Sequence, residues 1–201
     1  MRVIHGAPFA RTNYIIWAME EMGLDYENNP VNPLTGDTRM PGYLAINPNG
    51  LVPTLEEDGF TLWETMAINF YLAKNNGGHT LWSDDPQEEA LIMQWSIFGI
   101  VNLDKLCIDS VLHQIVLPKA MRDPAKLKAA EEGLIPHLKV LDNTLSGNKY
   151  LVGARFTLAD LNVSAMLEYA MKSGYDFSSY ENLQPWLRRC LGRPIRVKMN
   201  A

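Results

Sequence analysis

Hydrophobic and polar positions in the first half of the chain alternate between strand-like and helix-like patterns. Four short runs have the length and composition of strands, at residues 2–5, 24–28, 52–57 and 60–62. Two stretches repeat with helical period, at residues 13–22 and 65–74. Asp58-Gly59 is typical of a hairpin turn, and the prolines and glycines between residues 30 and 50 predict a long loop. The order predicts a small α/β domain with a mixed sheet.

The second half has almost no strand pattern and reads as a set of helices. The predicted helical segments lie at residues 86–117, 124–145, 157–172 and 185–191. The apolar residues of 89–117 occupy more than one face, which predicts a helix buried against its own domain and against a second subunit. Residues 75–86 are rich in Gly, Asn and Asp and read as a linker. We therefore expect an α/β domain over residues 1–76 and a helical bundle over 86–201.

Composition and charge exclude several classes of protein. The 201 residues are 47% hydrophobic and carry 18 basic against 23 acidic side chains, a formal net charge of −5. This balance argues against disorder, nucleic-acid binding and docking on an anionic membrane. The apolar stretch 91–103 is interrupted by polar residues and is too short to span a bilayer, and no signal peptide is visible. We expect a cytoplasmic protein.

Cysteine and histidine spacing gives no sign of a metal centre or a disulfide framework. The two cysteines, Cys107 and Cys190, are far apart and form no Cys-x-x-Cys motif, so thiol–disulfide exchange is disfavoured. The histidines outside the first strand also lack metal-ligand spacing: His79, His113 and His137. His5 lies on a strand that we expect to be central, where a buried structural imidazole is favoured over a catalytic one.

The segment Asn47-Pro-Asn-Gly-Leu-Val-Pro-Thr-Leu55 is the most informative part of the first half. Pro53 has no N–H to donate, and a cis Val52–Pro53 bond would turn the Val52 N–H and C=O toward a ligand that pairs as an added strand. Glu64 and Thr65 come at the start of the next helix. The helix N–H groups and the Thr65 hydroxyl suit a carboxylate, and Glu64 suits an ammonium group. Taken singly, each feature is also an ordinary strand start or helix cap.

The second half contains two further motifs. Gly153-Ala-Arg-Phe-Thr-Leu-Ala-Asp160 predicts a capping box, in which Thr157 accepts from the Asp160 N–H and Asp160 accepts from the Thr157 N–H. A capping box stabilises the start of its helix by about 0.5–2 kcal/mol. The second motif is the C-terminal segment Pro185-Trp-Leu-Arg-Arg-Cys-Leu-Gly-Arg-Pro194.

In order and spacing, these motifs resemble the glutathione S-transferase family, whose patterns are N-P-x-G-x-V-P-x-L, F-[ST]-x-A-D and W-x-x-R-C-x-x-R-P. The resemblance covers nearly the whole chain. It implies a thioredoxin-like N-terminal domain, a transferase-type C-terminal helical bundle, a homodimer and bound glutathione. The implied glutathione contacts are Arg39, Leu51, Val52, Pro53, Glu64 and Thr65. Arg39 is the position where relatives place a basic residue near the glycyl carboxylate, although on a loop it could equally be solvated.

The chain departs from the family at the catalytic position. Relatives that activate glutathione carry Ser, Tyr or Cys in the loop after the first strand. Here the equivalent position is Ala7 when aligned on Pro8-Phe9, or Phe9 or Ala10 when counted back from the helix. None of these side chains donates a hydrogen bond.

Other donors in the same loop offer an alternative way to activate the thiol. Lowering a thiol pKa by about two units from roughly 8.5 requires about 2.7 kcal/mol, and one hydrogen bond to a charged group supplies about 1.5–3 kcal/mol. We therefore expect backbone N–H groups with Thr12 or Asn13 to activate the thiol, and Arg11 to add positive charge nearby. Thr12 and Asn13 could equally be a plain helix N-cap pair.

Two functions follow from the resemblance. The first is a glutathione transferase that attacks an apolar electrophile held by Phe9, Trp95, Phe98 and Asn102, a placement taken from the family. The alternative is a non-catalytic protein of the same fold that binds glutathione or another ligand, or a partner. The missing hydroxyl favours the alternative, and the retained Val52-Pro53 and Glu64-Thr65 pattern argues against complete loss of binding.

Overall fold

The computed structural model describes residues 1–76 and 80–201. They form two compact units, Met1–Ser83 and Asp84–Ala201, and each is described by itself. His79 and the centre of the predicted linker lie outside the described residues.

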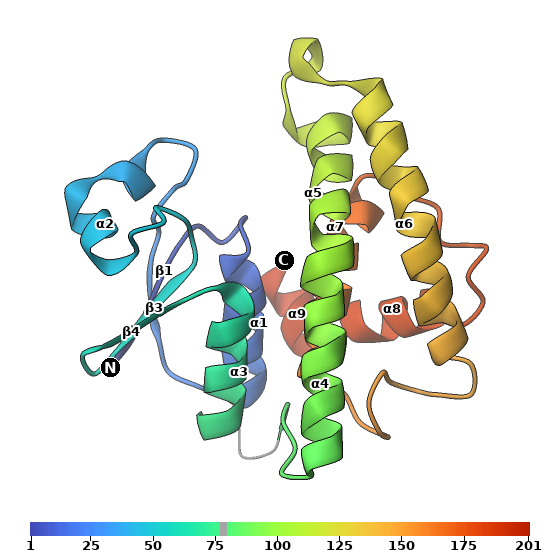
Figure 1. The fold of residues 1–201 in the computed structure, drawn as a ribbon, viewed down its shortest axis with the longest axis horizontal. Coiled ribbons are helices and arrows are strands. Elements are labelled where there is room, and N and C mark those ends of the chain that lie inside the picture. The colour runs from blue at the N-terminus through green and yellow to red at the C-terminus, as the bar shows by residue number, and fades with distance from the viewer. Residues whose placement is uncertain (77–79) are drawn as a thin grey trace. The chain divides into compact units, whose positions relative to one another are not determined.

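The first unit is a mixed four-stranded sheet with helices on both faces (Figure 1). Its strands are β1 (Arg2–His5), β2 (Glu27–Asn29), β3 (Thr54–Glu57) and β4 (Phe60–Trp63). Its helices are α1 (Thr12–Met22), the 3₁₀ turn η1 (Asp37–Arg39), α2 (Pro41–Ile46) and α3 (Thr65–Asn76). The order across the sheet is β2-β1-β3-β4, with β1 and β2 parallel and the other pairs antiparallel. The prediction of a small α/β domain with a mixed sheet is confirmed.

Along the central strands β1 and β3, successive side chains point to opposite faces of the sheet. Ile4 and Leu55 are neighbours in the β1–β3 ladder and are fully buried, on the side covered by the packed pair α1 and α3. His5 points to the other face, where its ring meets Tyr43 of α2 edge-on. The prediction that residues 30–50 form a loop is wrong for α2, because Pro41 occupies the first helical turn, where its missing N–H costs nothing.

The second unit consists of helices, as predicted. A continuous helical run is made of α4 (Pro86–Phe98), the π segment η2 (Gly99–Leu103), α5 (Asp104–Val111) and the π segment η3 (Leu112–Val116). After it come the 3₁₀ turn η4 (Lys119–Met121), α6 (Pro124–Thr144), α7 (Leu158–Lys172), α8 (Leu183–Leu191) and α9 (Pro194–Met199). Helix α7 is buried along most of its length, and α4, α5 and α8 pack against it (Figure 1). The sequence patterns did not predict α9.

The run from Pro86 to Val116 is 31 residues long and, by length and composition alone, could cross a membrane; it is the one such helix in the described part of the chain. The prediction that this region is too short to span a bilayer is therefore wrong as to length. One helix of this kind is weak evidence for a membrane, because core helices of bundles have the same composition. Here the run contacts both α6 and α7.

Two buried carboxylates tie the helices of this unit together. Asp160 is fully buried and accepts the N–H groups of Thr157 (3.0 Å) and Leu151 (2.9 Å) and the indole N–H of Trp186 (2.8 Å). The predicted capping box at the start of α7 is thus present. Farther along α7, Glu168 is 4% exposed and pairs with Arg196 of α9, which is 3% exposed.

Candidate functional site

Three loops leave the sheet of the first unit at the same end of its strands, and we refer to this end as the edge. In the β1–β3 ladder His5 lies opposite Thr54, and in the β3–β4 ladder Thr54 lies opposite Trp63. One residue beyond this row come Gly6, Pro53 and Glu64. The loop after β1, the Val52–Pro53 segment and the start of α3 are therefore brought together, as the sequence motifs require.

The segment before β3 presents the predicted binding residues at this edge. The Val52–Pro53 peptide bond is cis. Leu51 is 55% exposed, Val52 is half-buried and Pro53 is buried. The backbone at Val52 is thus placed at the surface, while the neighbouring proline anchors the segment.

The start of α3 completes the edge. Glu64 is exposed and has φ of 77°, a left-handed conformation that is uncommon for a residue with a side chain and that clusters at functional sites. Thr65, the first residue of α3, is only 4% exposed. The first N–H groups of α3 have no acceptor within their own helix, so this end carries partial positive charge beside the Glu64 carboxylate.

Arg39 stands next to the turn that leads into Leu51. Its Nη1 donates to the carbonyl oxygen of Asn49 at 3.3 Å, and its side chain is exposed. Gly50 has φ of 60°, and a Cβ there would lie 2.6 Å from Arg39 Nη1 and 2.9 Å from the Thr38 carbonyl oxygen. A glycine is therefore required for Arg39 to lie against this turn.

The loop after β1 offers few side-chain donors. Thr12 is fully buried, and its hydroxyl has no hydrogen-bond partner among the described residues. A ligand would reach that hydroxyl only if the loop moved, because the oxygen itself is buried. Gly6 lies so close that a Cβ there would be 2.1 Å from Thr12 Oγ1. Asn13 is half-buried and donates through Nδ2 to the Pro8 carbonyl oxygen at 2.9 Å. Phe9 is 57% exposed, while Ala7 is buried.

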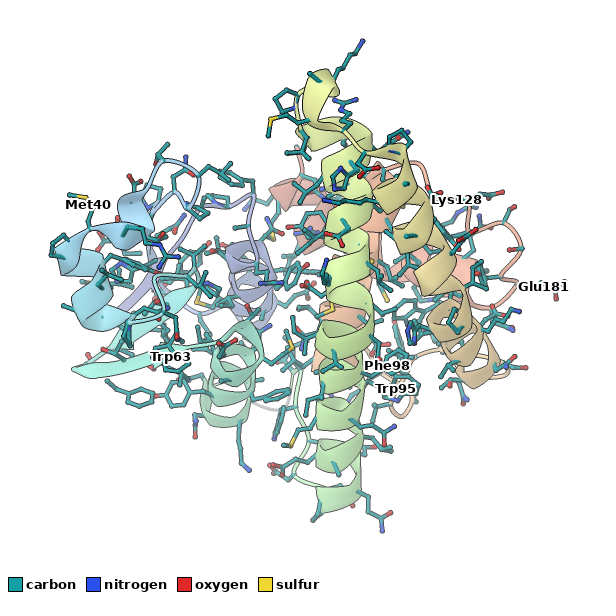
Figure 2. The ribbon with its side chains drawn as sticks, turned by 45° about the horizontal axis from the view of Figure 1, so that its top comes forward. Met40, Trp63, Trp95, Phe98, Lys128 and Glu181 are labelled. Atoms are coloured by element: carbon teal, nitrogen blue, oxygen red, sulfur yellow. The ribbon has the colours of Figure 1, made fainter. Side chains whose placement is uncertain are left out.

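The residues predicted for an apolar substrate belong to both units. In the second unit, Trp95 and Phe98 of α4 contact each other edge-to-face with ring centroids 5.4 Å apart (Figure 2). Trp95 is 8% exposed, and Phe98 also meets His137 of α6. Asn102 lies in η2 and donates to the Phe98 carbonyl oxygen. These contacts are internal to the bundle, and a shared substrate site with Phe9 stays a prediction.

Other titratable groups have structural partners. His5 Nε2 lies 2.7 Å from Glu56 Oε2 and its Nδ1 lies 3.0 Å from Asn29 Nδ2, which fits a buried structural imidazole. Burial raises the pKa of both Cys107 and Cys190 far above the usual range, which disfavours the reactive thiolate form of each. Among residues 1–76 and 80–201, no group of three His, Cys, Asp or Glu side chains could hold a metal ion.

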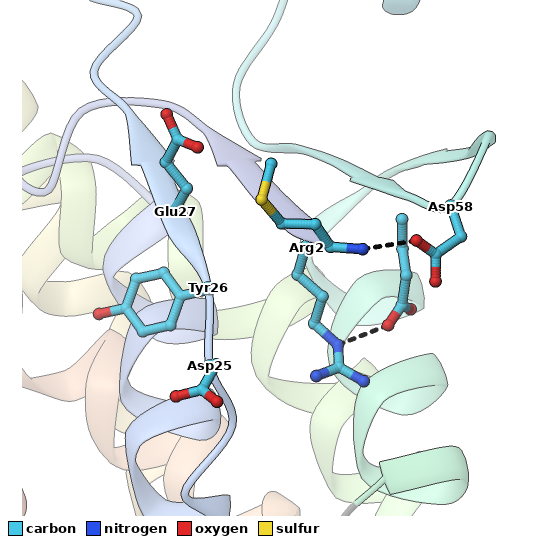
Figure 3. Close-up of a pocket in the computed structure, with 7 residues that line it drawn as sticks. Arg2, Asp25, Tyr26, Glu27 and Asp58 are labelled. Atoms are coloured by element: carbon cyan, nitrogen blue, oxygen red, sulfur yellow. Dashed lines mark hydrogen bonds and ion pairs between the residues drawn. The ribbon is translucent and has the colours of Figure 1, made fainter.

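A separate concavity of about 420 Å³ lies at the opposite end of the sheet (Figure 3). Arg2 pairs there with Glu57 at 2.6 Å and the terminal amine pairs with Asp58, and the carboxylates of Asp25 and Glu27 also line it. It contains none of the residues predicted from the sequence motifs.

Comparison with known proteins matches both units to one family. Residues 2–74 match the model "Glutathione S-transferase, N-terminal domain" and residues 107–194 match "Glutathione S-transferase, C-terminal domain". A glutathione S-transferase of Hyoscyamus muticus is 30% identical over 92% of this chain and 90% of its own length. The chain belongs to the glutathione S-transferase family. Glutathione S-transferase F13 of Arabidopsis thaliana is 29% identical over 92% of this chain and 88% of its own.

Solved structures of this glutathione S-transferase family share the fold. Glutathione transferase F7 from Populus trichocarpa superposes with a TM-score of 0.91 at 28% identity, covering all of this chain and 98% of its own. A theta class enzyme from Xanthomonas axonopodis pv. citri, solved with glutathione bound, gives a TM-score of 0.91 at 29% identity over 98% and 95% of the two chains. The thioredoxin-like domain followed by a transferase-type helical domain is confirmed.

Proposed function

We propose that the first unit binds glutathione along the edge formed by Leu51–Pro53 and Glu64–Thr65. The observation that supports this most is that the sheet register brings these two segments together beside the loop after β1. The ligand backbone pairs with Val52 as an added strand. Its γ-glutamyl carboxylate accepts from Thr65 and the first N–H groups of α3, and its ammonium group pairs with Glu64. Arg39 receives the glycyl carboxylate.

We further propose that the protein is a glutathione transferase that joins the thiolate of glutathione to an apolar electrophile. Thiol activation falls to backbone N–H groups at the start of α1 and to the Asn13 amide, since the Thr12 hydroxyl is covered. The helix end adds about 0.3–1 kcal/mol of thiolate stabilisation to the hydrogen bonds. The exposed ring of Phe9 contributes to the electrophile site of the first unit. A contribution from Trp95, Phe98 and Asn102 of the second unit stays a prediction.

One observation favours a second candidate, a non-catalytic glutathione-binding protein. Ala7, Phe9 and Ala10 stand at the positions where relatives carry the residue that contacts sulfur, and none of the three has a hydroxyl or thiol group. Such a protein would keep the contacts at Val52, Glu64 and Thr65 and lose only the chemistry.

A pair of measurements tests both candidates. Calorimetry with millimolar glutathione is expected to show binding that is weakened at least tenfold by Glu64→Gln combined with Thr65→Ala, with Glu27→Gln as a control at an exposed site. Conjugation is then followed with a panel of electrophiles that includes a chlorinated nitrobenzene. Turnover supports the transferase, and binding without turnover of any electrophile supports the second candidate. No binding by the wild-type chain would rule out both.

We also propose a cytoplasmic homodimer. The exposed face of α4 and η2 carries Met93, Ile97 and Val101, which are 37%, 47% and 69% exposed and follow one another at intervals of four residues. An apolar stripe of this kind on a helix surface suits a second copy. Ile97→Glu is expected to give a monomer in sedimentation analysis. The matched change Val140→Glu, at a 45% exposed position on α6, is expected to leave the dimer intact. A wild-type monomer at micromolar concentration would refute the proposal.

A further inference from the structure

A buried polar cluster lies behind the predicted glutathione edge. It consists of Tyr43 of α2, Asn47 directly after α2, and Thr54, the first residue of β3. We refer to these three residues as the Leu51 cluster because they surround the Leu51 carbonyl group. Tyr43 is 7% exposed, Asn47 2% and Thr54 0%. Polar side chains this deep cost stability unless they are hydrogen-bonded, and these three are bonded to one another.

The hydrogen bonds converge on the carbonyl oxygen of Leu51. The Tyr43 hydroxyl donates to it at 2.6 Å, and Asn47 Nδ2 donates to it at 2.8 Å. Asn47 Nδ2 also lies 3.0 Å from Thr54 Oγ1, and that oxygen lies 3.0 Å from the Tyr43 hydroxyl. The single hydroxyl proton of Tyr43 is donated to the Leu51 carbonyl oxygen. The Thr54 hydroxyl must therefore donate to the Tyr43 oxygen while it accepts from Asn47. All donor protons of the cluster are then used.

This bonding fixes the direction of the Leu51–Val52 peptide plane. Both lone pairs of the Leu51 carbonyl oxygen are occupied from inside the unit, so the carbonyl group points inward. In a trans peptide unit the C=O and the following N–H point in opposite directions. The Val52 N–H is therefore aimed away from the cluster, toward the side on which Leu51 is exposed.

We propose that Tyr43 and Asn47 are positioning residues that aim the Val52 N–H at the backbone of bound glutathione. The inference rests on the proposed function and adds the residues that set its geometry. Neither side chain touches the ligand. They act by holding the Leu51 carbonyl group, and Asn47 also fixes the preceding turn by accepting from the Asn49 N–H at 3.1 Å. Burial raises the pKa of Tyr43, which keeps its hydroxyl protonated and donating.

The proposal separates these residues from those that hold the charged end of glutathione. Loss of one donor leaves the Leu51 carbonyl group with a single hydrogen bond and lets the peptide plane rotate. The hydrogen bond that the Val52 N–H donates to the cysteinyl carbonyl group of glutathione is then weakened. The contacts of the γ-glutamyl group with Glu64 and α3 lie on a different element and are not affected.

The experiment compares two ligands by calorimetry. Glutathione carries the cysteinyl carbonyl group, and γ-glutamylethylamide has the same charged end without it. For Tyr43→Phe we expect about 3- to 10-fold weaker glutathione binding, the loss that corresponds to one hydrogen bond, and unchanged γ-glutamylethylamide binding. Asn47→Asp replaces a donor with an acceptor facing the Leu51 oxygen, and a larger loss for glutathione alone is expected. Where turnover is measurable, KM for glutathione rises and kcat is retained.

Matched variants exclude a general effect of destabilisation. Tyr26→Phe removes a tyrosine hydroxyl that bonds Glu20 elsewhere in the same unit, and Thr54→Ser keeps the hydroxyl of the cluster; both are expected to bind like the wild type. Equal weakening of both ligands, or glutathione binding unchanged in both Tyr43→Phe and Asn47→Asp, overturns the inference while the proposed function stands. Absence of glutathione binding in the wild type overturns both.

Discussion

The Asp160 carboxylate allows a stability prediction at the level of single atoms. Oδ1 accepts from the Leu151 N–H and the Trp186 indole, and Oδ2 accepts from the Thr157 N–H at 3.0 Å and lies 3.2 Å from Thr157 Oγ1. Asp160→Asn keeps one oxygen for the first two donors and places an NH₂ group against the Thr157 N–H. One buried backbone donor is then unsatisfied, which costs about 1–3 kcal/mol.

Asp160→Ala removes the acceptor for three buried N–H donors at once. The same cost per donor gives a loss of roughly 3–9 kcal/mol, which is comparable with the whole stability of a typical domain. Thr157→Val removes only the cap hydroxyl and is expected to cost about 0.5–2 kcal/mol. The order of destabilisation should therefore be Asp160→Ala, then Asp160→Asn, then Thr157→Val.

Equilibrium unfolding in urea, followed by tryptophan fluorescence and far-UV circular dichroism, measures these losses. Trp186 reports on the surroundings of Asp160, because its indole N–H donates to the Asp160 carboxylate. The reasoning would be refuted if Asp160→Asn were as destabilising as Asp160→Ala, because the two oxygens would then not act separately.

Three further predictions concern other parts of the chain. Glu168→Gln leaves Arg196 buried without a counter-charge and should cost about 3–5 kcal/mol in urea unfolding, whereas Lys172→Met, at the 48% exposed partner, should cost less than about 1 kcal/mol. Burial raises the pKa of Glu168, but the ion pairs and hydrogen bonds with Arg196 and Lys172 together outweigh it and hold the pKa below the usual range. This stabilisation is therefore present above about pH 4.3 and is lost as the pH falls through the lowered pKa; equal acid sensitivity of the wild type and Glu168→Gln would contradict this. Gly50→Ala should weaken glutathione binding severalfold and lower stability by about 1–2 kcal/mol, because φ is positive and the added methyl group meets Arg39 and Thr38; calorimetry and thermal unfolding check both, and wild-type behaviour would show that the turn is free to shift.

Most of the fold follows from local patterns in the sequence. The hairpin at Asp58-Gly59, the capping box at Thr157 and Asp160, and the C-terminal glycine of α1 are set by neighbouring residues, and the structure has all three. Helices α2 and α9 were missed because each is six residues long, shorter than two turns, and is opened by a proline that also reads as a loop. Short helices of this kind are stabilised by tertiary packing rather than by their own pattern.

The candidate site could be predicted in part. Residues 51–53 and 64–65 were identified from their motifs, and the sheet register brings them to one edge. The burial of the Thr12 hydroxyl could not be predicted, because it depends on the close approach of Gly6 across a loop of unknown path. Nor could the Leu51 cluster, since Tyr43 belongs to the helix that the patterns missed. A buried asparagine followed by a threonine seven residues later carried no signal by itself.

The two π segments of the long helix have a consequence for how this chain can vary. Each one accommodates a single extra residue within a turn, and one residue advances an α-helix by about 100°. Deleting one residue between Gly99 and Leu103 would restore a regular turn and leave residues 104–116 in nearly their present orientation relative to α4, because the wide turn already absorbs the extra residue. Asp104 and Cys107 would stay inside the bundle. Deleting one residue in the regular helix on either side would instead rotate everything beyond it by about 100°, so the π segment is the place where the length of this helix can change by one residue without loss of packing.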